Sequence, residues 1–282
     1  MSQASSPFWC VGGVLIDHIG RSHAPVRTAQ SNPGAARLSP GGVAFNIARA
    51  IARLGGDVAL TGAVGRDAGA DMIADALRKA GVADHLIRTH HPTGSYLAIE
   101  DADGDMFAGV SDLSALETLS AESLRAAIAP APTNARITID ANLTEAQIAA
   151  MAETAHWLAA EVVSAPKAPR LIPTLPRLNA LFCNQSEALA LGAAGDAHAA
   201  ATALAQTSQA VVFVTDGPRP AAVAQGAKTW TASPPQISAA SVTGAGDAFT
   251  AGALTALAAG APPEQALHAA LSAAAAHLER QS

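Results

Sequence analysis

A glycine-rich turn opens an Ala-rich helix near the end of the chain, in the stretch Ser241-Val242-Thr243-Gly244-Ala245-Gly246-Asp247-Ala248-Phe249-Thr250-Ala251-Gly252. The first N–H groups of a helix lack partners and face its positive end, so an anion is expected just ahead of Gly246. Asp247 in the same turn would repel an anion that is only held there. The position of Asp247 makes chemical sense if the carboxylate accepts a proton from a hydroxyl group that attacks a phosphate. The stretch therefore predicts phosphoryl transfer, although taken alone it also fits an ordinary helix start with an acidic residue.

The composition indicates a globular protein that acts on small molecules. The chain has 282 residues, 50% of them hydrophobic, enough for the core of one large α/β domain or two small ones. A net charge of −6, the lack of a basic run and an aromatic content of 4% argue against a nucleic-acid groove or an anionic membrane surface. Cys10 and Cys183 each end an apolar run, where buried free thiols are common, and residues 1–9 lack signal-peptide features. We therefore expect a cytoplasmic protein without a membrane span.

Strands and helices alternate through the first part of the chain. Residues 8–16 are an apolar run that ends at Asp17, which predicts a buried strand with an acid at its carboxyl end. Ligands of open α/β sheets bind at that end. The pair Gly41-Gly42 then precedes an amphipathic helix, and a strand at residues 58–64 and a second helix follow. This alternation predicts parallel βαβ units.

Further core strands are expected later in the chain, at residues 136–140, 179–183 and 211–215. The last of these is the most β-branched run and is therefore predicted to be a central strand. Two Ala-rich helices, at about residues 244–259 and 263–279, close the chain.

Two segments depart from the alternation, at about residues 18–40 and 86–112. They consist of short runs around turn residues, which is typical of antiparallel strands outside a main sheet. Together they would form a small sheet that covers the site as a lid, although most of the first segment also fits a surface loop. An exposed small sheet has unpaired edges and apolar side chains such as Leu97, Ile99 and Phe107, so a homodimer through these strands is predicted.

Polar side chains that follow the predicted strands are candidate ligands for small molecules. Asn46 falls in the first turn after the glycine pair, where its amide can point at a ligand near the backbone. Asn184 and Glu187 lie three residues apart at a helix start, and Glu187 is expected to orient Mg²⁺ through water. The same pair taken alone fits a capping box. Thr215 and Gly217 follow the β-branched strand and would line the phosphates of a nucleotide.

These motifs, in this order, resemble the ribokinase-like (PfkB) carbohydrate kinases over nearly the whole chain. The resemblance is carried by Gly41-Gly42…Asn46, Gly62-Ala63-Val64-Gly65-Arg66-Asp67, Asn184…Glu187, Val214-Thr215-Asp216-Gly217 and Gly244-Ala245-Gly246-Asp247. It implies an α/β fold of three αβα layers with a mostly parallel central sheet, a single domain over residues 1–282 and a small β-sheet lid. It also implies ATP-dependent transfer of the γ-phosphoryl group, with Mg²⁺ as cofactor.

The resemblance also implies roles for individual residues. Asp247 would take the proton of the acceptor hydroxyl, while the amides of Gly244, Ala245 and Gly246 would hold the developing charge. The other implied groups are Asp17, Gly41, Gly42 and Asn46 for the ribose hydroxyls; Asp112, Asn32 and Ser95 for the base; and Asn184, Glu187, Thr215, Gly217 and Thr243 for the nucleotide and Mg²⁺.

Within this family the chain looks most like the bacterial pseudouridine kinases. The likeness rests on Ser31-Asn32-Pro33-Gly34, Thr93-Gly94-Ser95-Tyr96-Leu97, Val110-Ser111-Asp112-Leu113 and Asp140-Ala141-Asn142-Leu143. It implies phosphorylation of the 5′-hydroxyl of pseudouridine. The alternatives are another nucleoside or sugar kinase, of the ribose, adenosine or fructose type, and a non-catalytic binding protein on the same fold.

Two details of the chain qualify this likeness. Ser241 stands where many members carry an Asp associated with a monovalent cation, so that cation would lack its usual carboxylate. Glu161 and Lys167 fall where the subgroup has a charged pair near the active site.

Overall fold

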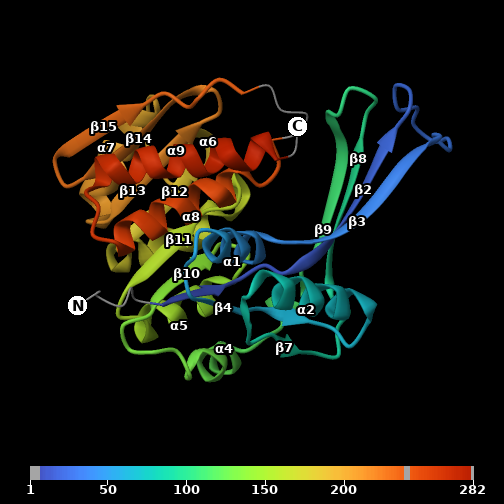
Figure 1. The fold of residues 1–282 in the computed structure, drawn as a ribbon, viewed down its shortest axis with the longest axis horizontal. Helices are drawn as coiled ribbons and strands as arrows, with labels where there is room; N and C mark the ends of the chain where they lie inside the picture. The colour runs from blue at the N-terminus through green and yellow to red at the C-terminus, as the bar shows by residue number, and fades with distance from the viewer. Residues whose placement is uncertain (1–6, 238–241, 281–282) are drawn as a thin grey trace.

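The main body is a nine-stranded sheet with helices on both faces, and a four-stranded sheet projects from it (Figure 1). The computed structural model describes residues 7–237 and 242–280. The strand order of the large sheet is β15-β14-β13-β12-β11-β10-β1-β4-β6. Its strands are β1 (Phe8–Val11), β4 (Val58–Thr61), β6 (Ala83–Asp84), β10 (Arg136–Asp140), β11 (Leu158–Glu161), β12 (Ala180–Asn184), β13 (Val211–Asp216), β14 (Arg219–Gln225) and β15 (Lys228–Ala232).

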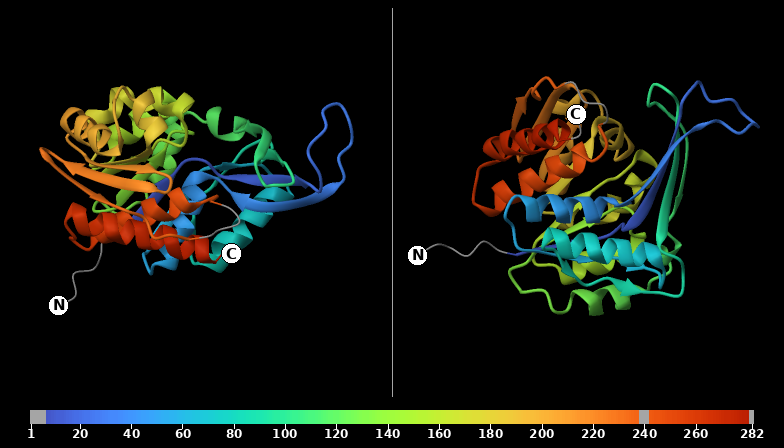
Figure 2. Two further views of the ribbon diagram at one scale, coloured as in Figure 1. Left: turned by 90° about the horizontal axis from the view of Figure 1, so that it is seen from above. Right: turned by 45° about the vertical axis from the view of Figure 1, so that its right-hand side comes forward.

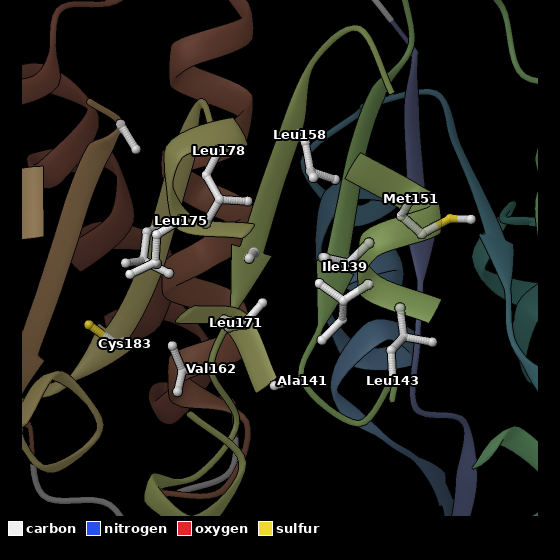
Figure 3. Packing of buried hydrophobic residues seen from close by; sticks show 14 of the residues in the cluster. Ile139, Ala141, Leu143, Met151, Leu158, Val162, Leu171, Leu175, Leu178 and Cys183 are labelled. Carbon is white, nitrogen blue, oxygen red and sulfur yellow. The ribbon is translucent and has the colours of Figure 1, made fainter. Parts of the chain in front are cut away.

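The helices form two layers because both faces of the large sheet are apolar. Phe182 and Phe213 belong to one buried cluster, and their neighbours Leu181 and Val212 belong to the other, since successive side chains point to opposite faces. Figure 3 shows part of the second cluster. The first face is covered by α1 (Val43–Arg53), α2 (Ala68–Ala80), α8 (Ala245–Ala258) and α9 (Pro263–Glu279). The second is covered by α3 (Ser114–Glu117), α4 (Ala121–Ile128), α5 (Glu145–Thr154), the 3-10 helix η1 (Ala165–Arg177), α6 (Gln185–Ala190) and α7 (Ala197–Ser208).

The small sheet has the strand order β3-β2-β8-β9 and extends away from the body (Figure 2). Its strands are β2 (Leu15–Ser22), β3 (Gly34–Gly41), β8 (Gly94–Glu100) and β9 (Met106–Asp112). The β2/β3 and β8/β9 pairs are antiparallel, as expected, but β2 and β8 run parallel. A separate pair, β5 (Ala63–Val64) and β7 (Ile87–Arg88), lies outside both sheets.

Two predicted strands are each divided in the structure. The run over residues 8–16 breaks at Gly12-Gly13, so β1 enters the large sheet and β2 enters the small one. Asp17 therefore lies within a strand of the small sheet rather than at the end of a large-sheet strand. The run over residues 58–64 likewise breaks at Gly62 into β4 and β5. In both places glycine lets the chain change direction within an apolar run that gives no other sign of a break.

Other boundaries differ less from the predictions. β13 is an interior strand, but only two strands, β14 and β15, lie beyond it, and both run antiparallel to their neighbours. The predicted terminal helices match α8 and α9 within a few residues. Cys10 and Cys183 are both free and buried. Within the described residues, no helix has the length and hydropathy needed to cross a membrane.

Candidate active site

A cavity of about 390 Å³ lies where the carboxyl ends of β11, β12 and β13 meet the start of α8. Its lining residues are Val43, Glu161, Val163, Phe182, Cys183, Asn184, Glu187, Thr215, Val242, Gly244, Gly246, Asp247, Phe249 and Thr250. The cavity therefore sits at the sheet edge where open α/β folds bind ligands, and it contains the glycine-rich turn.

The start of α8 carries no side-chain cap. Gly244 is the N-cap residue, and its φ of 80° is the left-handed conformation that glycine adopts most easily. The N–H of Ala245 donates to the carbonyl oxygen of Val242 at 3.2 Å, so this amide already has an acceptor. No hydrogen bond inside the described part of the chain is recorded for the amides of Gly246 and Asp247. The amides of Gly246 and Asp247 are thus available to an anion at the start of the helix, and the predicted role of the amides of Gly244, Ala245 and Gly246 stays a prediction.

Asp247 projects from the first turn of α8 and contacts a residue far away in the sequence. The side-chain amide of Asn46, in the first turns of α1, donates to Asp247 Oδ2 at 2.8 Å. The pKa of Asp247 is raised to about 7: burial raises it most, the hydrogen bond from Asn46 lowers it, and the charges of Asp140 and Asp17 raise it. A carboxylate whose pKa lies near neutrality is suited to accept a proton from a hydroxyl group.

The diol-binding group predicted from the first strand and the glycine pair assembles beside Asp247. Asp17 lies close enough to raise the pKa of Asp247, and burial raises the pKa of Asp17 itself, while Arg37 and His18 lower it. A Cβ atom at Gly41 would collide with the Asp17 carboxylate, so only glycine leaves room for this acid. The structure therefore brings Asp17, Gly41, Gly42 and Asn46 together with Asp247.

Ser95 and Asp112 do not join this group. Ser95 pairs with Ile16 on one side and with Asp112 on the other, and paired residues share a face of the sheet. Asp17, the next residue after Ile16, points to the opposite face. Asp112 accepts from the N–H and the hydroxyl of Ser114 at 2.9 and 2.6 Å, and these bonds lower its pKa.

The face that Asp17 shares carries Tyr96 and Ser111 instead. Both residues lie in the register row of Asp17, on β8 and β9. The alternation of side chains along β8 shows from the sequence that Ser95 and Tyr96 point to opposite faces. Only the pairing of β2 with β8 determines which of the two shares the face of Asp17.

Asn32 lies at the tip of the β2/β3 hairpin, where its side chain holds the loop together. Its Oδ1 accepts from the N–H of Arg27 at 2.9 Å, and its Nδ2 donates to the carbonyls of Arg27 and Gln30. The structure therefore does not bring Asn32 to Asp17 and Asp247.

Asn184 and Glu187 form a capping box at the start of α6. Glu187 Oε2 accepts the N–H of Asn184 at 2.9 Å, and Asn184 Oδ1 accepts the N–H of Glu187 at 3.0 Å and the hydroxyl of Ser186 at 2.7 Å. The oxygen of Asn184 is thus used within the cap, and hydrogen bonds from the backbone and the side chain of Asn184 lower the pKa of Glu187. Glu187 is buried at the cavity, which raises its pKa, and only one of its oxygens is used in the cap.

The donor set fits a Mg²⁺ ion that is held partly by water and by phosphate oxygens. Among the described residues no three His, Cys, Asp or Glu side chains form a metal cage. Mg²⁺ is usually bound by one or two carboxylates together with water and substrate phosphates, and the remaining oxygen of Glu187 suits that role.

The residues predicted to contact a nucleotide lie along the same edge of the sheet. Thr215 pairs in register with Asn184 and lines the cavity, and Gly217 follows it in a left-handed turn with φ 59°. Thr243 lies in the glycine-rich turn, and its carbonyl oxygen is 2.9 Å from Nε2 of His277 on α9. His277 could not be identified from the sequence, because it is one of several isolated histidines and only the packing of α8 on α9 brings it here. Ser241 lies outside the described residues.

Glu161, a half-buried acid that lines the cavity, was expected in a charged pair with Lys167, without a more specific role. It ends β11, and its Oε2 accepts the hydroxyl of Thr250 on α8 at 2.6 Å. Burial holds its pKa well above the usual range, and Glu187, Asp247 and Asp140 raise it further. Its expected charged neighbour Lys167 instead donates to Asn142 Oδ1 at 2.5 Å. In the sequence, the feature that could have indicated a role for Glu161 is its position at the end of a predicted strand, a position that Asp140 shares.

The chain is similar in sequence and in fold to known kinases. The profile described as "pfkB family carbohydrate kinase" matches residues 8–282. A carbohydrate kinase from Agrobacterium tumefaciens is 31% identical and superposes with a TM-score of 0.83 over 96% of this chain and 90% of its own. A ribokinase from Thermotoga maritima, 19% identical, shares the fold with a TM-score of 0.85, over 98% of this chain and 94% of its own.

Among curated proteins, the pseudouridine kinase of Escherichia coli is 32% identical over 182 residues, which is 63% of this chain. The match spans only 58% of the length of that relative.

Proposed function

Because this chain belongs to the pfkB family of carbohydrate kinases, we propose that it transfers the γ-phosphoryl group of ATP to the 5′-hydroxyl of pseudouridine. The observation that carries the proposal is the position of Asp247, which lies at the uncapped start of α8 with a pKa of about 7 and a hydrogen bond from Asn46. A base and an anion site within one helical turn are what phosphoryl transfer to an alcohol requires.

In this proposal each part of the site has one task. Asp247 accepts the proton of the attacking hydroxyl, and the N–H groups of Gly246 and Asp247 stabilise the charge that develops on the transferred phosphoryl group. Asp17 accepts hydrogen bonds from the ribose hydroxyls, while Gly41 and Gly42 let the sugar approach the backbone. The small sheet closes over the acceptor as a lid and excludes water.

The nucleotide is assigned to the other side of the cavity. Thr215, Gly217 and Thr243 contact ATP, and the amide of Asn184 contacts a phosphate. Mg²⁺ neutralises charge on the phosphates when it is bound. Glu187 orients the water around the ion, since one of its oxygens is not used by the capping box.

Pseudouridine is preferred over other acceptors because the lid segments resemble those of pseudouridine kinases and the chain is 32% identical to one such enzyme. Ribose, adenosine and fructose are the alternative acceptors, since the same base and anion site would serve any primary alcohol. A cytoplasmic location follows from the two free cysteines, which are typical of reducing compartments.

The test is release of ADP with a panel of acceptors. The full chain is assayed with ATP and Mg²⁺ at equal concentrations of pseudouridine, uridine, adenosine, guanosine, ribose and fructose. Turnover with pseudouridine well above the others is expected. Faster ADP release with a sugar or with another nucleoside would show that the substrate is not pseudouridine while leaving the kinase activity in place. No ADP release with any acceptor would favour a non-catalytic binding protein.

The outer face of the small sheet supports a homodimer. Leu38, Leu97 and Val110 lie in one row across β3, β2, β8 and β9, on the side opposite Asp17, and are 58%, 51% and 67% exposed. Ile99 continues this face further along β8, 47% exposed. A second copy would cover these apolar side chains and the sheet edges. Light scattering at micromolar concentration should give a dimer that Leu97→Glu dissociates, and a monomeric unmodified protein would contradict this.

A further inference from the structure

Asp140 ends β10 and is buried, with 1% of its surface exposed. Its carboxylate makes three hydrogen bonds, all with backbone N–H groups. Oδ2 accepts from Gly13 at 2.8 Å and from Ala44 at 2.9 Å, and Oδ1 accepts from Asn142 at 2.9 Å.

The two donors to Oδ2 belong to the segments that join the small sheet to the body. Gly13 precedes β2, which begins at Leu15, and Ala44 follows β3, which ends at Gly41. A single oxygen atom therefore holds both of these joining segments, around Gly13 and around Ala44, which we call the roots of the small sheet. Figure 1 shows β2 and β3 leaving the body side by side.

The glycines at these roots are packed around the same carboxylate. A Cβ atom at Gly12 would collide with the Asp140 carboxyl group. A Cβ atom at Gly42, whose φ is 103°, would collide with the carbonyl of Gly13. The two roots thus approach each other closely enough for one oxygen to reach both N–H groups.

Ala44 also connects Asp140 to the base. Ala44 and Asn46 are neighbours in the first turns of α1, and Asn46 donates to Asp247. A shift of this helix start would move Asn46 away from Asp247 and change the distance between Asp17 on β2 and the base. Asp140 is therefore the junction of the acceptor side of the site with its catalytic side.

We propose that Asp140 is a positioning residue for phosphoryl transfer. It fixes the two roots of the small sheet and the start of α1, so that Asp17 and Asn46 present the acceptor hydroxyl to Asp247. This inference rests on the proposed function in taking Asp247 as the base.

The three backbone N–H groups around Asp140 need an acceptor at both carboxylate oxygens, so we expect that an amide cannot replace the carboxylate. In Asp140→Asn, the NH₂ group would face either the N–H of Asn142 or those of Gly13 and Ala44. Each orientation sets donors against donors and leaves buried N–H groups without acceptors. Burial raises the pKa of Asp140, and the three N–H groups and Lys167 partly offset this effect.

The experiment compares Asp140→Asn with Thr138→Val in the full chain. Thr138 lies on the same strand and the same face, is also 1% exposed, and its hydroxyl has no recorded partner, so it is a matched control. We expect kcat of Asp140→Asn to fall about 10- to 100-fold, as for a displaced catalytic group, with KM for ATP unchanged and KM for the acceptor raised. Thr138→Val should keep kcat. If Asp140→Asn melts earlier but keeps its kcat per folded molecule, the residue is only structural and the proposal is wrong.

Amide hydrogen exchange gives a readout that does not depend on activity. The N–H groups of Gly13 and Ala44 should exchange faster in Asp140→Asn than in Thr138→Val, and equal exchange would overturn the proposal. If the chain phosphorylates no acceptor at all, the proposed function fails while the exchange result still tests Asp140.

Gly13→Ala is used if Asp140→Asn does not fold. A Cβ atom at Gly13 would strike the Asn142 side chain and displace the root of β2 without removing the carboxylate. It should also lower kcat at least about tenfold, because the root carries Asp17. An unchanged kcat would contradict the inference.

Discussion

Two helices begin at the same cavity with an acidic residue in their first turn, α6 with Glu187 and α8 with Asp247. At α6 the acid and the N-cap Asn184 satisfy each other's backbone N–H groups in a capping box. At α8 the N-cap is a glycine without a side chain, and the acid is held by Asn46 from another helix. The closed start stabilises one wall of the cavity, while the open start is where we propose that the phosphoryl group and the acceptor hydroxyl bind.

The largest effect is expected from removing the acid at the open start. Asp247→Asn should lower kcat about 10²-fold or more, the scale of a lost general base, with ligand binding retained. The folded pKa of about 7 is above the unfolded value, so the ionised carboxylate destabilises the fold above about pH 7. The variant should therefore melt higher than the unmodified protein at pH 8. Steady-state kinetics and thermal melts measure both, and retained activity would remove Asp247 from its role.

Gly244→Ala should damage the open start without changing its charge. The left-handed φ of 80° disfavours alanine by about 1–2 kcal/mol, and the new Cβ would contact the His277 ring. We expect kcat to fall at least about tenfold, since loss of one donor to a developing charge costs about 10²–10³-fold.

Gly260→Ala is the matched control, because Gly260 has φ 83° beyond the far end of α8 and its Cβ would meet no atom within 4 Å. Gly260→Ala should lower the free energy of unfolding about as much as Gly244→Ala does, but leave kcat unchanged. Equal kinetics of the two variants would show that the geometry of the turn is not needed.

The contact between Asn46 and Asp247 should set the pH dependence. As pH falls through about 7, Asp247 binds a proton and kcat/KM should decrease. The hydrogen bond from Asn46 lowers this pKa, so Asn46→Ala should move the inflection to higher pH. A profile over pH 5–9 measures the shift. An inflection that stays in place would mean that another group controls the rate.

The smallest effect is expected at the closed start. Asn184→Ala removes the N-cap of α6 and should cost about 1 kcal/mol of unfolding free energy, with a rise in KM for ATP of a few-fold. Asp196 caps α7 in the same way, accepting from the N–H of Ala199 at 2.9 Å, but it does not line the cavity. Asp196→Ala should therefore cost similar stability and leave KM for ATP unchanged. If both variants alter KM alike, the effect is one of general stability.

The α/β class, most helices and the motifs at Asp247, Asn46 and Glu187 could be predicted from the sequence. They depend on local periodicity and on short motifs whose chemistry is visible in a few adjacent residues. The division of the strands at Gly12-Gly13 and Gly62 between different sheets could not be predicted, because an apolar run interrupted by glycine contains no information on which sheet each half joins. The face that each residue of β8 presents was equally hidden, which is why Ser95 and Asp112 were expected at the base and Tyr96 was not.

The sequence by itself determined the chemistry at the start of α8, since the glycines, the acid and the helix that follows lie within twelve residues. Only the tertiary structure decided which groups surround that chemistry. Asn46, Glu161, His277 and Asp140 reach the turn or its neighbours across long separations in the chain, through contacts of α1, β11, α9 and β10. Such contacts depend on the register and packing of whole elements, and no local pattern specifies them.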